Sequence, residues 1–143
     1  MDDLRFITSE GDPKPEDKKV LTEGLLAHHM SKGHPRKSKV FSIFLKNQND
    51  KVFGGIIVSL LWNGMEIQSL WVDESVRKQG WGRKLLEAVE TEAIKRGCTI
   101  VYTNTFSWQA GDFYTKLGYA TYGKLDGFPE NNSLIYYRKN LVS

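Results

Sequence analysis

The sequence contains a single cysteine, Cys98, so no disulfide can form within the chain and no multi-cysteine metal site is available. One cysteine in 143 residues also weakly favours a reducing compartment. No apolar run reaches membrane-spanning length, because the longest, 54–62, is broken by Ser59. The first five residues lack the basic and then apolar profile of a signal peptide. These absences favour a cytoplasmic protein that has no membrane partner.

A strong excess of charge of one sign is also missing. The chain has 20 Lys and Arg against 17 Asp and Glu, a formal net charge of +3. This balance suits an anionic ligand as well as nucleic acid, so it does not choose between them. Apolar residues make up 40% of the chain, which is enough for a packed core. Because we find no repeat, low-complexity tract or dividing linker, we expect one domain over residues 1–143.

Hydrophobic periodicity and turn residues predict an alternation of strands and helices. The expected elements are strands at 4–8, 40–46, 52–62, 65–72, 99–103, 119–124 and 133–139, and helices at 16–32, from the Gly82 region to Gly97, and at 108–117. Asn63-Gly64 predicts a type I′ hairpin turn between two of the strands. Ser107 is expected to cap the last helix. The order predicts one mixed α/β domain.

A glycine-containing loop joins the strand at 65–72 to the following helix. Gly80 and Gly82 let the backbone approach a ligand closely, and free N–H groups at a helix start bind anions. Four cations surround these glycines: Arg77, Lys78, Arg83 and Lys84. Cations in the first helical turn are unfavourable unless an anion is bound there. The loop therefore predicts a phosphate site.

Other interpretations of this loop are less well supported. Leu85 stands where a dinucleotide-binding fingerprint needs its third glycine, and no Gly-x-x-x-x-Gly-Lys-Ser/Thr motif occurs in the chain. A solvated turn with a basic face is an alternative that the loop alone leaves open. A nucleic-acid footprint at 77–84 would give salt-dependent binding, but no helix-turn-helix pattern accompanies it. We expect no nucleic-acid partner.

Two blocks of the sequence resemble a known family. Arg77-x-x-Gly80-x-Gly82 resembles the Arg/Gln-x-x-Gly-x-Gly/Ala signature of the GNAT superfamily of N-acetyltransferases. Downstream, 113–119 reads Phe-Tyr-Thr-Lys-Leu-Gly-Tyr and is similar to that family's second block. Both blocks occur in order at the expected separation, and the resemblance runs from about residue 40 to residue 141.

The resemblance implies a GNAT-like α/β fold: a mostly antiparallel twisted sheet, splayed into a V by a strand bulge and flanked by three to four helices. It also implies acetyl-CoA as acetyl donor, with the pyrophosphate on the loop N–H groups and the pantetheine arm along the strand before it. The implied cofactor-contacting residues are Leu70, Trp71, Val72, Arg77, Lys78, Gln79, Gly80, Trp81, Gly82, Arg83, Lys84, Asn104 and Tyr114. The indole of Trp81 either packs on the cofactor or stays in solvent.

Acetyl transfer to an amine needs a neutral amine, a stabilised oxyanion and a proton for the leaving thiolate. By resemblance, Tyr114 supplies that proton, and a backbone N–H near Val72 serves the oxyanion. A tyrosine packed in the core is the alternative for Tyr114. Glu66 is the candidate base, because strand alternation places it on one face with Leu70 and Val72. An ordinary solvent-facing glutamate is the alternative there.

Several other residues carry weaker expectations. His28 or His29 contacts substrate or lies on a solvated helix face. With His34 they make three histidines, but no nearby carboxylate or cysteine spacing supports a metal site. Cys98 is expected to be a buried structural thiol, which favours direct transfer over an acetyl-cysteine intermediate. The acceptor site is expected to involve Trp108 and Gln109, with Phe128 and Pro129 covering it.

The sequence thus predicts an N-acetyltransferase that passes an acetyl group from acetyl-CoA directly to a primary amine of a small molecule or peptide. A coenzyme A-binding module without catalysis, acting by interaction, is the alternative. The resemblance leaves room for a homodimer. Neither the acceptor nor the base is fixed by the sequence.

Overall fold

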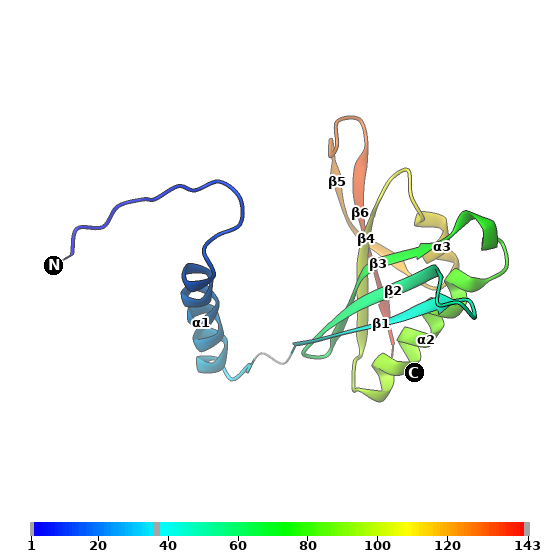
Figure 1. The fold of residues 1–143 in the computed structure, drawn as a ribbon, viewed down its shortest axis with the longest axis horizontal. Coiled ribbons are helices and arrows are strands. Elements are labelled where there is room, and N and C mark those ends of the chain that lie inside the picture. Colours follow the sequence, from blue (N-terminus) through cyan, green and yellow to red (C-terminus); the bar gives the residue numbers. More distant parts are fainter. Residues whose placement is uncertain (1, 36–37, 142–143) are drawn as a thin grey trace. The chain divides into compact units, whose positions relative to one another are not determined.

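The computed structural model describes residues 2–35 and 38–141 (Figure 1). The chain divides into two units, residues 1–36 and 37–143. In the first unit, helix α1 (Pro15–Ser31) confirms the helix expected at 16–32. Pro15 opens it and Glu16 and Asp17 follow in the first turn, where a fixed φ and negative charge suit a helix start.

The strand expected at 4–8 does not form. Leu4 and Phe6 are 93% and 103% exposed, and these residues pair with no strand in the part of the chain that the structure describes. Alternating side chains give a strand only when a neighbour accepts the backbone hydrogen bonds. The prediction at 4–8 was therefore wrong.

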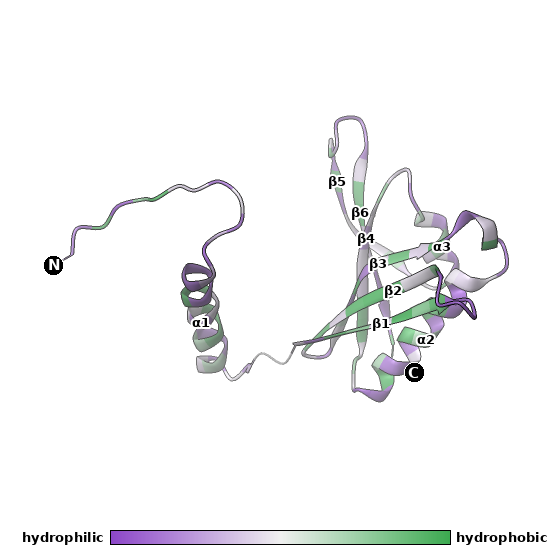
Figure 2. Cartoon of the chain, in the orientation of Figure 1, coloured by the Kyte–Doolittle hydropathy of each residue, from purple (hydrophilic) through white to green (hydrophobic). Residues whose placement is uncertain are grey.

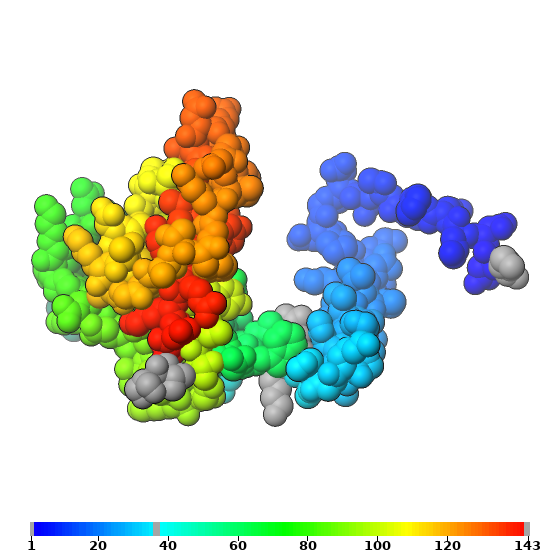
Figure 3. All heavy atoms as spheres, turned by 180° about the vertical axis from the view of Figure 1, so that it is seen from behind, coloured from blue at the N-terminus to red at the C-terminus, as the bar shows by residue number. Residues whose placement is uncertain are grey.

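The second unit is built on one six-stranded sheet. Its strands are β1 (Ser38–Lys46), β2 (Val52–Leu61), β3 (Gly64–Val72), β4 (Ile100–Phe106), β5 (Ala120–Asp126) and β6 (Ser133–Asn140). They lie in the order β1-β2-β3-β4-β6-β5, and among the strands of the described residues only β3 and β4 are parallel neighbours. The β5–β6 hairpin forms the orange and red surface in Figure 3. The predicted mixed α/β fold is confirmed.

Helices α2 (Trp81–Lys95) and α3 (Gly111–Lys116) and a short 3-10 turn, η1 (Glu74–Val76), complete this unit. Apolar and polar residues alternate along α2 (Figure 2), which buries Leu85, Leu86, Val89 and Ala93. These side chains share the core with β-strand residues such as Ile56 and Val58. Ile94, an apolar residue at the same helical spacing, is 51% exposed.

The sheet opens between β3 and β4. The two strands pair only at their beginnings, from Gly64 opposite Ile100 to Glu66 opposite Tyr102. Ile67 pairs with Val58 and Ser69 with Ile57, so Gln68 between them is an extra, bulged residue. A bulge bends and twists its strand. This arrangement confirms the bulge and the V-shaped opening that the resemblance implied.

The hairpin between β2 and β3 turns one residue earlier than expected. Leu61 pairs with Gly64, so the central turn residues are Trp62 and Asn63. Trp62 has a φ of 51° and Asn63 does not share the positive value, so the type I′ prediction was wrong. Gly64 also pairs with Ile100 of β4. Pairing on both sides makes Gly64 a strand residue.

The last helix starts later than expected. Gly111 is its first residue, and no side chain caps it. Ser107 instead accepts a hydrogen bond from the Ser133 N–H at 3.2 Å, which joins the end of β4 to the start of β6. Because β4 runs on to Phe106, the chain must turn through 107–110 before a helix can begin.

Candidate functional site

A cleft of about 840 Å³ opens where β3 and β4 separate. Its walls come from β3, the loop that precedes α2, β4 and α3. It brings together most of the residues predicted to contact the cofactor: Leu70, Trp71, Val72, Arg77, Lys78, Gly80, Trp81, Gly82, Arg83, Asn104 and Tyr114. Glu66, Gln79 and Lys84 do not line it.

The first turn of α2 presents backbone N–H groups to this cleft. Gly80 precedes the helix with a φ of 82°, and no side chain caps the helix start. The N–H groups of Trp81, Gly82 and Arg83 have no intrahelical acceptor, because they occupy the first turn. A Cβ on Gly82 would lie 3.3 Å from the Phe113 ring. A helix start that has glycine residues and free backbone N–H donors is suited to bind a pyrophosphate.

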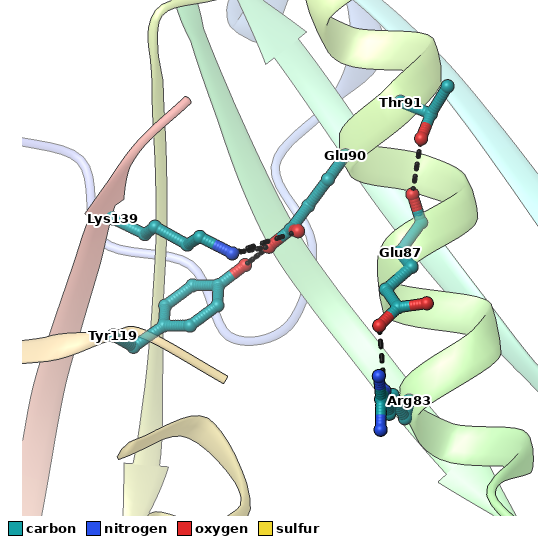
Figure 4. Close-up of polar contacts among 6 residues, drawn as sticks. All are labelled: Arg83, Glu87, Glu90, Thr91, Tyr119 and Lys139. Atoms are coloured by element: carbon teal, nitrogen blue, oxygen red, sulfur yellow. Dashed lines mark hydrogen bonds and ion pairs between the residues drawn. The ribbon is translucent and has the colours of Figure 1, made fainter. Parts of the chain in front are cut away.

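Three of the four cations around the loop, Arg77, Arg83 and Lys84, already have partners. The Arg77 Nε donates to the Val72 carbonyl at 2.9 Å, which ties the loop to the end of β3. Arg83 pairs with Glu87 at 2.7 Å on the exposed face of α2 (Figure 4). The Lys84 ammonium lies 4.5 Å from the centre of the Trp81 ring. Arg83 and Lys84 are therefore stabilised at the helix start without an anion. The predicted phosphate site rests on the free backbone N–H groups instead.

The β3 edge that faces the cleft has unpaired backbone groups. Beyond Glu66, β3 makes no ladder with β4. The Asp73 N–H donates to the Phe53 carbonyl of the β2 side at 2.7 Å. Because donors alternate along an antiparallel strand, the Val72 and Leu70 N–H groups point away from β2, toward the opening. An extended amide-bearing ligand can pair with this edge as a strand would.

Tyr114 is held on α3 among other aromatic rings. It is 6% exposed, packs edge-on to Tyr119 at 5.4 Å and lies nearly parallel to Tyr137 at 5.8 Å. Burial raises its pKa, and the polar Thr103 side chain partly opposes that shift. The phenol is therefore protonated at neutral pH and lines the cleft.

Glu66 lies elsewhere than the strand pattern indicated. Leu70 pairs with Ile56 and Ile67 with Val58, so the bulge at Gln68 puts Leu70 on the same face as Ile67. Glu66 therefore faces the opposite side of the sheet from Leu70 and Val72, and the predicted shared face was wrong. Its carboxylate contributes, after burial, to the raised pKa of Tyr102.

A buried polar cluster under the site was not anticipated. Glu90 of α2 is 8% exposed and accepts a hydrogen bond from the Tyr119 hydroxyl at 2.6 Å (Figure 4). The Lys139 ammonium of β6 lies 3.1 Å from the same carboxylate. Burial and the Glu90 carboxylate raise the pKa of Tyr119. Glu90 directly follows Val89 within the buried stripe of α2. Its position in that stripe was the sequence signal that could have predicted its burial.

Several residues that line the cleft carried no motif. Thr103 and Thr105 of β4 are buried, and Gln68 and Ser69 come from the bulge. Because side chains alternate along β4, Thr103 and Thr105 lie on one face of that strand. That face becomes a wall of the cleft only because β3 and β4 separate. Phe113 lies beneath Gly82 and belonged to the second block.

The residues expected near the acceptor form a cluster at the end of β4. Gln109 lines the cleft, and its Oε1 accepts hydrogen bonds from the Phe106 N–H and the Thr105 hydroxyl. Trp108 stacks on Phe106 at 4.8 Å, and Phe128 lies 5.8 Å from the same ring. Trp108 and Phe128 do not themselves line the cleft.

Cys98 is buried and lies outside the cleft lining, as expected of a structural thiol. Asp73 caps η1, where its carboxylate accepts a hydrogen bond from the Ser75 N–H. His28 and His29 fall in the last turn of α1, in the other unit. Over residues 2–35 and 38–141, no group of three or more His, Cys, Asp or Glu side chains is placed to hold a metal.

No helix within those same ranges combines the length and apolar character needed to cross a membrane.

Comparisons with known proteins agree with this geometry. An acetyltransferase of Agrobacterium fabrum is 28% identical over 136 residues, which cover 95% of this chain and 98% of that protein. The blasticidin-S acetyltransferase of Streptomyces morookaense is 26% identical over 95 residues, covering 66% of this chain and 70% of its own. The crystal structure of an acetyltransferase from Bacillus cereus matches with a TM-score of 0.81 and 29% identity, covering 93% of this chain and 97% of that one.

The family model of the acetyltransferase (GNAT) family matches residues 3–119, which include the glycine loop, the open β3 edge and Tyr114. The chain belongs to the GNAT family of acetyltransferases, enzymes that take their acetyl group from acetyl-CoA.

Proposed function

We propose that this acetyltransferase passes the acetyl group directly to a primary amine of a small molecule or peptide. One observation carries the proposal: the uncapped start of α2, the unpaired edge of β3 and Tyr114 all meet in a single cleft. The helix start and the strand edge suit an extended donor that carries a pyrophosphate. Tyr114 suits the thiolate that leaves when the acetyl group is transferred.

In this proposal the pyrophosphate lies on the N–H groups of Gly80, Trp81 and Gly82, with Arg83 beside them. The pantetheine arm lies along Leu70 and Val72, and its amides pair with the Leu70 backbone groups, which leaves the Val72 N–H for the acetyl carbonyl. Trp71, Arg77, Lys78, Gln79, Lys84 and Asn104 complete the proposed donor site. Gln79 and Lys84 stay predictions that rest on the family signature alone, since they flank the cleft without lining it.

The reaction itself uses few groups. The Val72 N–H donates to the carbonyl oxygen as the amine nitrogen attacks the acetyl carbon. The carbon–sulfur bond then breaks, its electron pair goes to sulfur, and Tyr114 gives the sulfur a proton. Because Cys98 lies outside the cleft lining, an acetyl-cysteine intermediate has no support.

Glu66 is the proposed base, acting through water. A free alkylamine has a pKa of about 10.4 and is mostly protonated at neutral pH, so a proton must leave before attack. Glu66 is the last β3 residue that pairs with β4, just before the strands separate. Its carboxylate faces the side of the sheet opposite α2, so an acceptor would have to approach from that side.

The acceptor class is supported by the relatives. One similar protein is named for acetylating blasticidin S, a single small molecule. We therefore propose a small amine or a peptide α-amine, to be found with a panel of polyamines, aminoglycosides, nucleoside antibiotics and short peptides.

The first test is calorimetric titration of the protein with coenzyme A and acetyl-CoA. Wild-type protein should bind in the micromolar range. Gly82→Trp should remove binding, because its side chain meets the Phe113 ring and fills the donor surface. Ala88→Trp, which places the same indole on the exposed face of α2, is the control and should bind normally. Absence of binding by wild type would refute the donor site; binding without transfer to any amine would favour a module without catalysis.

We further propose that residues 1–143 act as one acetyltransferase domain, because the alignment with the Agrobacterium fabrum relative covers 95% of the chain and so includes both units. A cytoplasmic location and a homodimer remain proposals from the sequence. Fractionation of cells and the mass of the protein in solution test them.

A further inference from the structure

We infer that Gln109 is a specificity-determining residue for the acceptor, and that the acceptor it selects is an amine next to a peptide group: the α-amine of a peptide. A lysine side chain or a polyamine has no such group beside its amine. The inference rests on the proposed function, because it takes acetyl transfer to an amine as given. It narrows the acceptor to one chemical class and names the groups that recognise it.

The carboxamide of Gln109 has a fixed orientation. Its Oε1 accepts hydrogen bonds from the Phe106 N–H at 2.9 Å and from the Thr105 hydroxyl at 3.1 Å. A backbone N–H can only donate, so the atom that faces Phe106 must be the oxygen of the carboxamide. The Gln109 N–H donates to the Phe106 carbonyl at 2.9 Å, which holds the turn that carries this side chain. The position of the Nε2 group follows from these bonds.

The Nε2 group is the part of the Gln109 side chain that is left for a ligand. Gln109 lines the cleft, and within residues 2–35 and 38–141 its Nε2 hydrogens have no hydrogen-bond acceptor. A carboxamide nitrogen donates hydrogen bonds and does not accept them. It therefore suits a carbonyl oxygen of the acceptor, and it offers nothing to an ammonium group.

The end of β4 presents backbone groups that suit the same ligand. In the β4–β6 pair, the Ser107 N–H donates to the Ser133 carbonyl at 2.8 Å. Because hydrogen bonds alternate in direction along an antiparallel strand, the N–H and C=O of Asn104 point away from β6, toward β3. Beyond Tyr102, β4 makes no ladder with β3, so these two groups face the cleft. A peptide supplies the matching carbonyl and N–H, while the donor arm pairs with Leu70 on the opposite wall.

The charges of the cleft favour the same class of amine. Among the described residues that line it, the ionised side chains are all cations: Arg77, Lys78 and Arg83. An alkylamine has a pKa of about 10.4 and arrives as an ammonium ion, whereas a peptide α-amine has a pKa of about 7.7 to 8.0 and is partly neutral at neutral pH. The α-amine is therefore repelled less by these cations, and it asks less of Glu66 as the base.

The covalent step stays as proposed above. The lone pair of the neutral α-amine forms the bond to the acetyl carbon, the carbon–sulfur bond breaks, and its electron pair goes to sulfur. Tyr114 gives the sulfur a proton and regains one from water, and the nitrogen loses a proton to Glu66 through water. The product is a peptide acetylated at its first nitrogen.

The first test lets the two kinds of amine compete within one molecule. The full chain and acetyl-CoA are incubated with a pool of X-Ala-Lys amides, in which X is every residue except lysine, and fragment mass spectra locate the acetyl group. The ratio of α- to ε-acetylation should exceed the ratio without protein at least about tenfold, because only the α-amine lies beside a carbonyl that Gln109 can bind. An equal ratio, or a preference for the lysine side chain, would overturn the inference.

A second test removes one hydrogen bond from the acceptor. Replacing the first peptide bond of the best peptide by an ester keeps the α-amine and the carbonyl but deletes the N–H that meets the Asn104 carbonyl. The kcat/KM for the acceptor should fall about tenfold, with an unchanged KM for acetyl-CoA. Equal kcat/KM values for peptide and ester would contradict the pairing with β4.

The third test changes Gln109 itself. Gln109→Glu keeps an oxygen for Phe106 and Thr105 but replaces the Nε2 donors by a second, negatively charged oxygen. The ratio of kcat/KM for the best peptide to that for the best alkylamine should fall about tenfold or more. Gln48→Glu, the same change in the exposed turn between β1 and β2, is the control and should leave the ratio unchanged. Should Gln109→Glu fail to fold, Gln109→Met, which also lacks the donors, takes its place.

The outcomes separate this inference from the proposed function. An unchanged ratio in the Gln109 variant would refute its role in specificity. Transfer to polyamines or aminoglycosides but not to the peptide pool would refute the acceptor class, while acetyl transfer to an amine would stand. Binding of acetyl-CoA without transfer to any amine would instead refute the proposed function, and the inference with it.

Discussion

Tyr114 is buried among aromatic rings, yet its phenol belongs to the cleft wall. Tyr114→Phe keeps the packing and removes only the hydroxyl. We expect kcat to fall by about 10² or more, the usual contribution of a general acid, with little change in the KM for acetyl-CoA. Steady-state kinetics measure both constants.

Tyr122→Phe is the matched control, because Tyr122 is an exposed tyrosine of β5. It should leave kcat unchanged. If Tyr114→Phe behaved like Tyr122→Phe, the leaving thiolate would take its proton from another source.

Alkaline pH should destabilise the protein through two buried tyrosines. Burial raises the pKa of Tyr114, and burial with the Glu90 carboxylate raises that of Tyr119. A tyrosine in the unfolded chain ionises at about pH 10, whereas Tyr114 and Tyr119 of the folded protein stay neutral there. The stability that these groups contribute is therefore complete below about pH 10 and is lost as pH rises further.

Thermal melts between about pH 8 and pH 11 check this dependence. Tyr119→Phe should be less stable than wild type at pH 8, because Glu90 loses a donor, but its melting temperature should fall less steeply with pH. Equal slopes for the two proteins would contradict the assignment to Tyr119.

Helix α2 carries two glutamates with different surroundings (Figure 4). Glu90 is buried between Tyr119 and Lys139, whereas Glu87 pairs with Arg83 in solvent. Glu90→Ala leaves a partly buried lysine without its carboxylate and should destabilise the protein by about 3 kcal/mol. Glu87→Ala, the same change three residues away, should have almost no effect.

Urea denaturation measures both changes in the free energy of unfolding. A small loss for Glu90→Ala would mean that Lys139 reaches solvent when the carboxylate is removed.

The bulge in β3 gives a sharper test of the cleft. Deleting Gln68 restores regular pairing with β2 and flips no side chain, because Ile67 and Leu70 already share a face. The straighter strand should lie closer to β4 and narrow the opening. We expect the variant to fold with an unchanged or higher melting temperature and to bind coenzyme A at least about tenfold more weakly, since the β3 edge would then be engaged by β4. Normal affinity would contradict the role of the bulge.

The same bulge shows where sequence reasoning stopped. The period of α2, the succession of strands and helices from residue 40 onward and the two family blocks were readable, because each rests on local pattern. The face of Glu66 was wrong, since one unpaired residue inverts the alternation and no local signal marks it. Gly64 and Ser107 were misplaced for a related reason: contacts with distant strands overrode turn and cap preferences.

The donor site should also couple binding to stability. A ligand that binds only the folded protein stabilises it by about 2.7 kcal/mol at one hundred times its dissociation constant. Acetyl-CoA should therefore raise the melting temperature of wild type and of Ala88→Trp, and not of Gly82→Trp. Thermal melts over a range of acetyl-CoA concentrations measure the effect. A shift retained by Gly82→Trp would place the ligand elsewhere.

The unpaired edge of β3 has a consequence for the working cycle. An exposed row of backbone donors and acceptors is a place where another extended chain can add itself. If the pantetheine arm occupies that row, the donor is in effect a temporary seventh strand that every turnover removes and replaces. The interval between release of coenzyme A and capture of acetyl-CoA is then the time during which the sheet is open to self-association, so scarcity of donor should favour aggregation as well as slow catalysis.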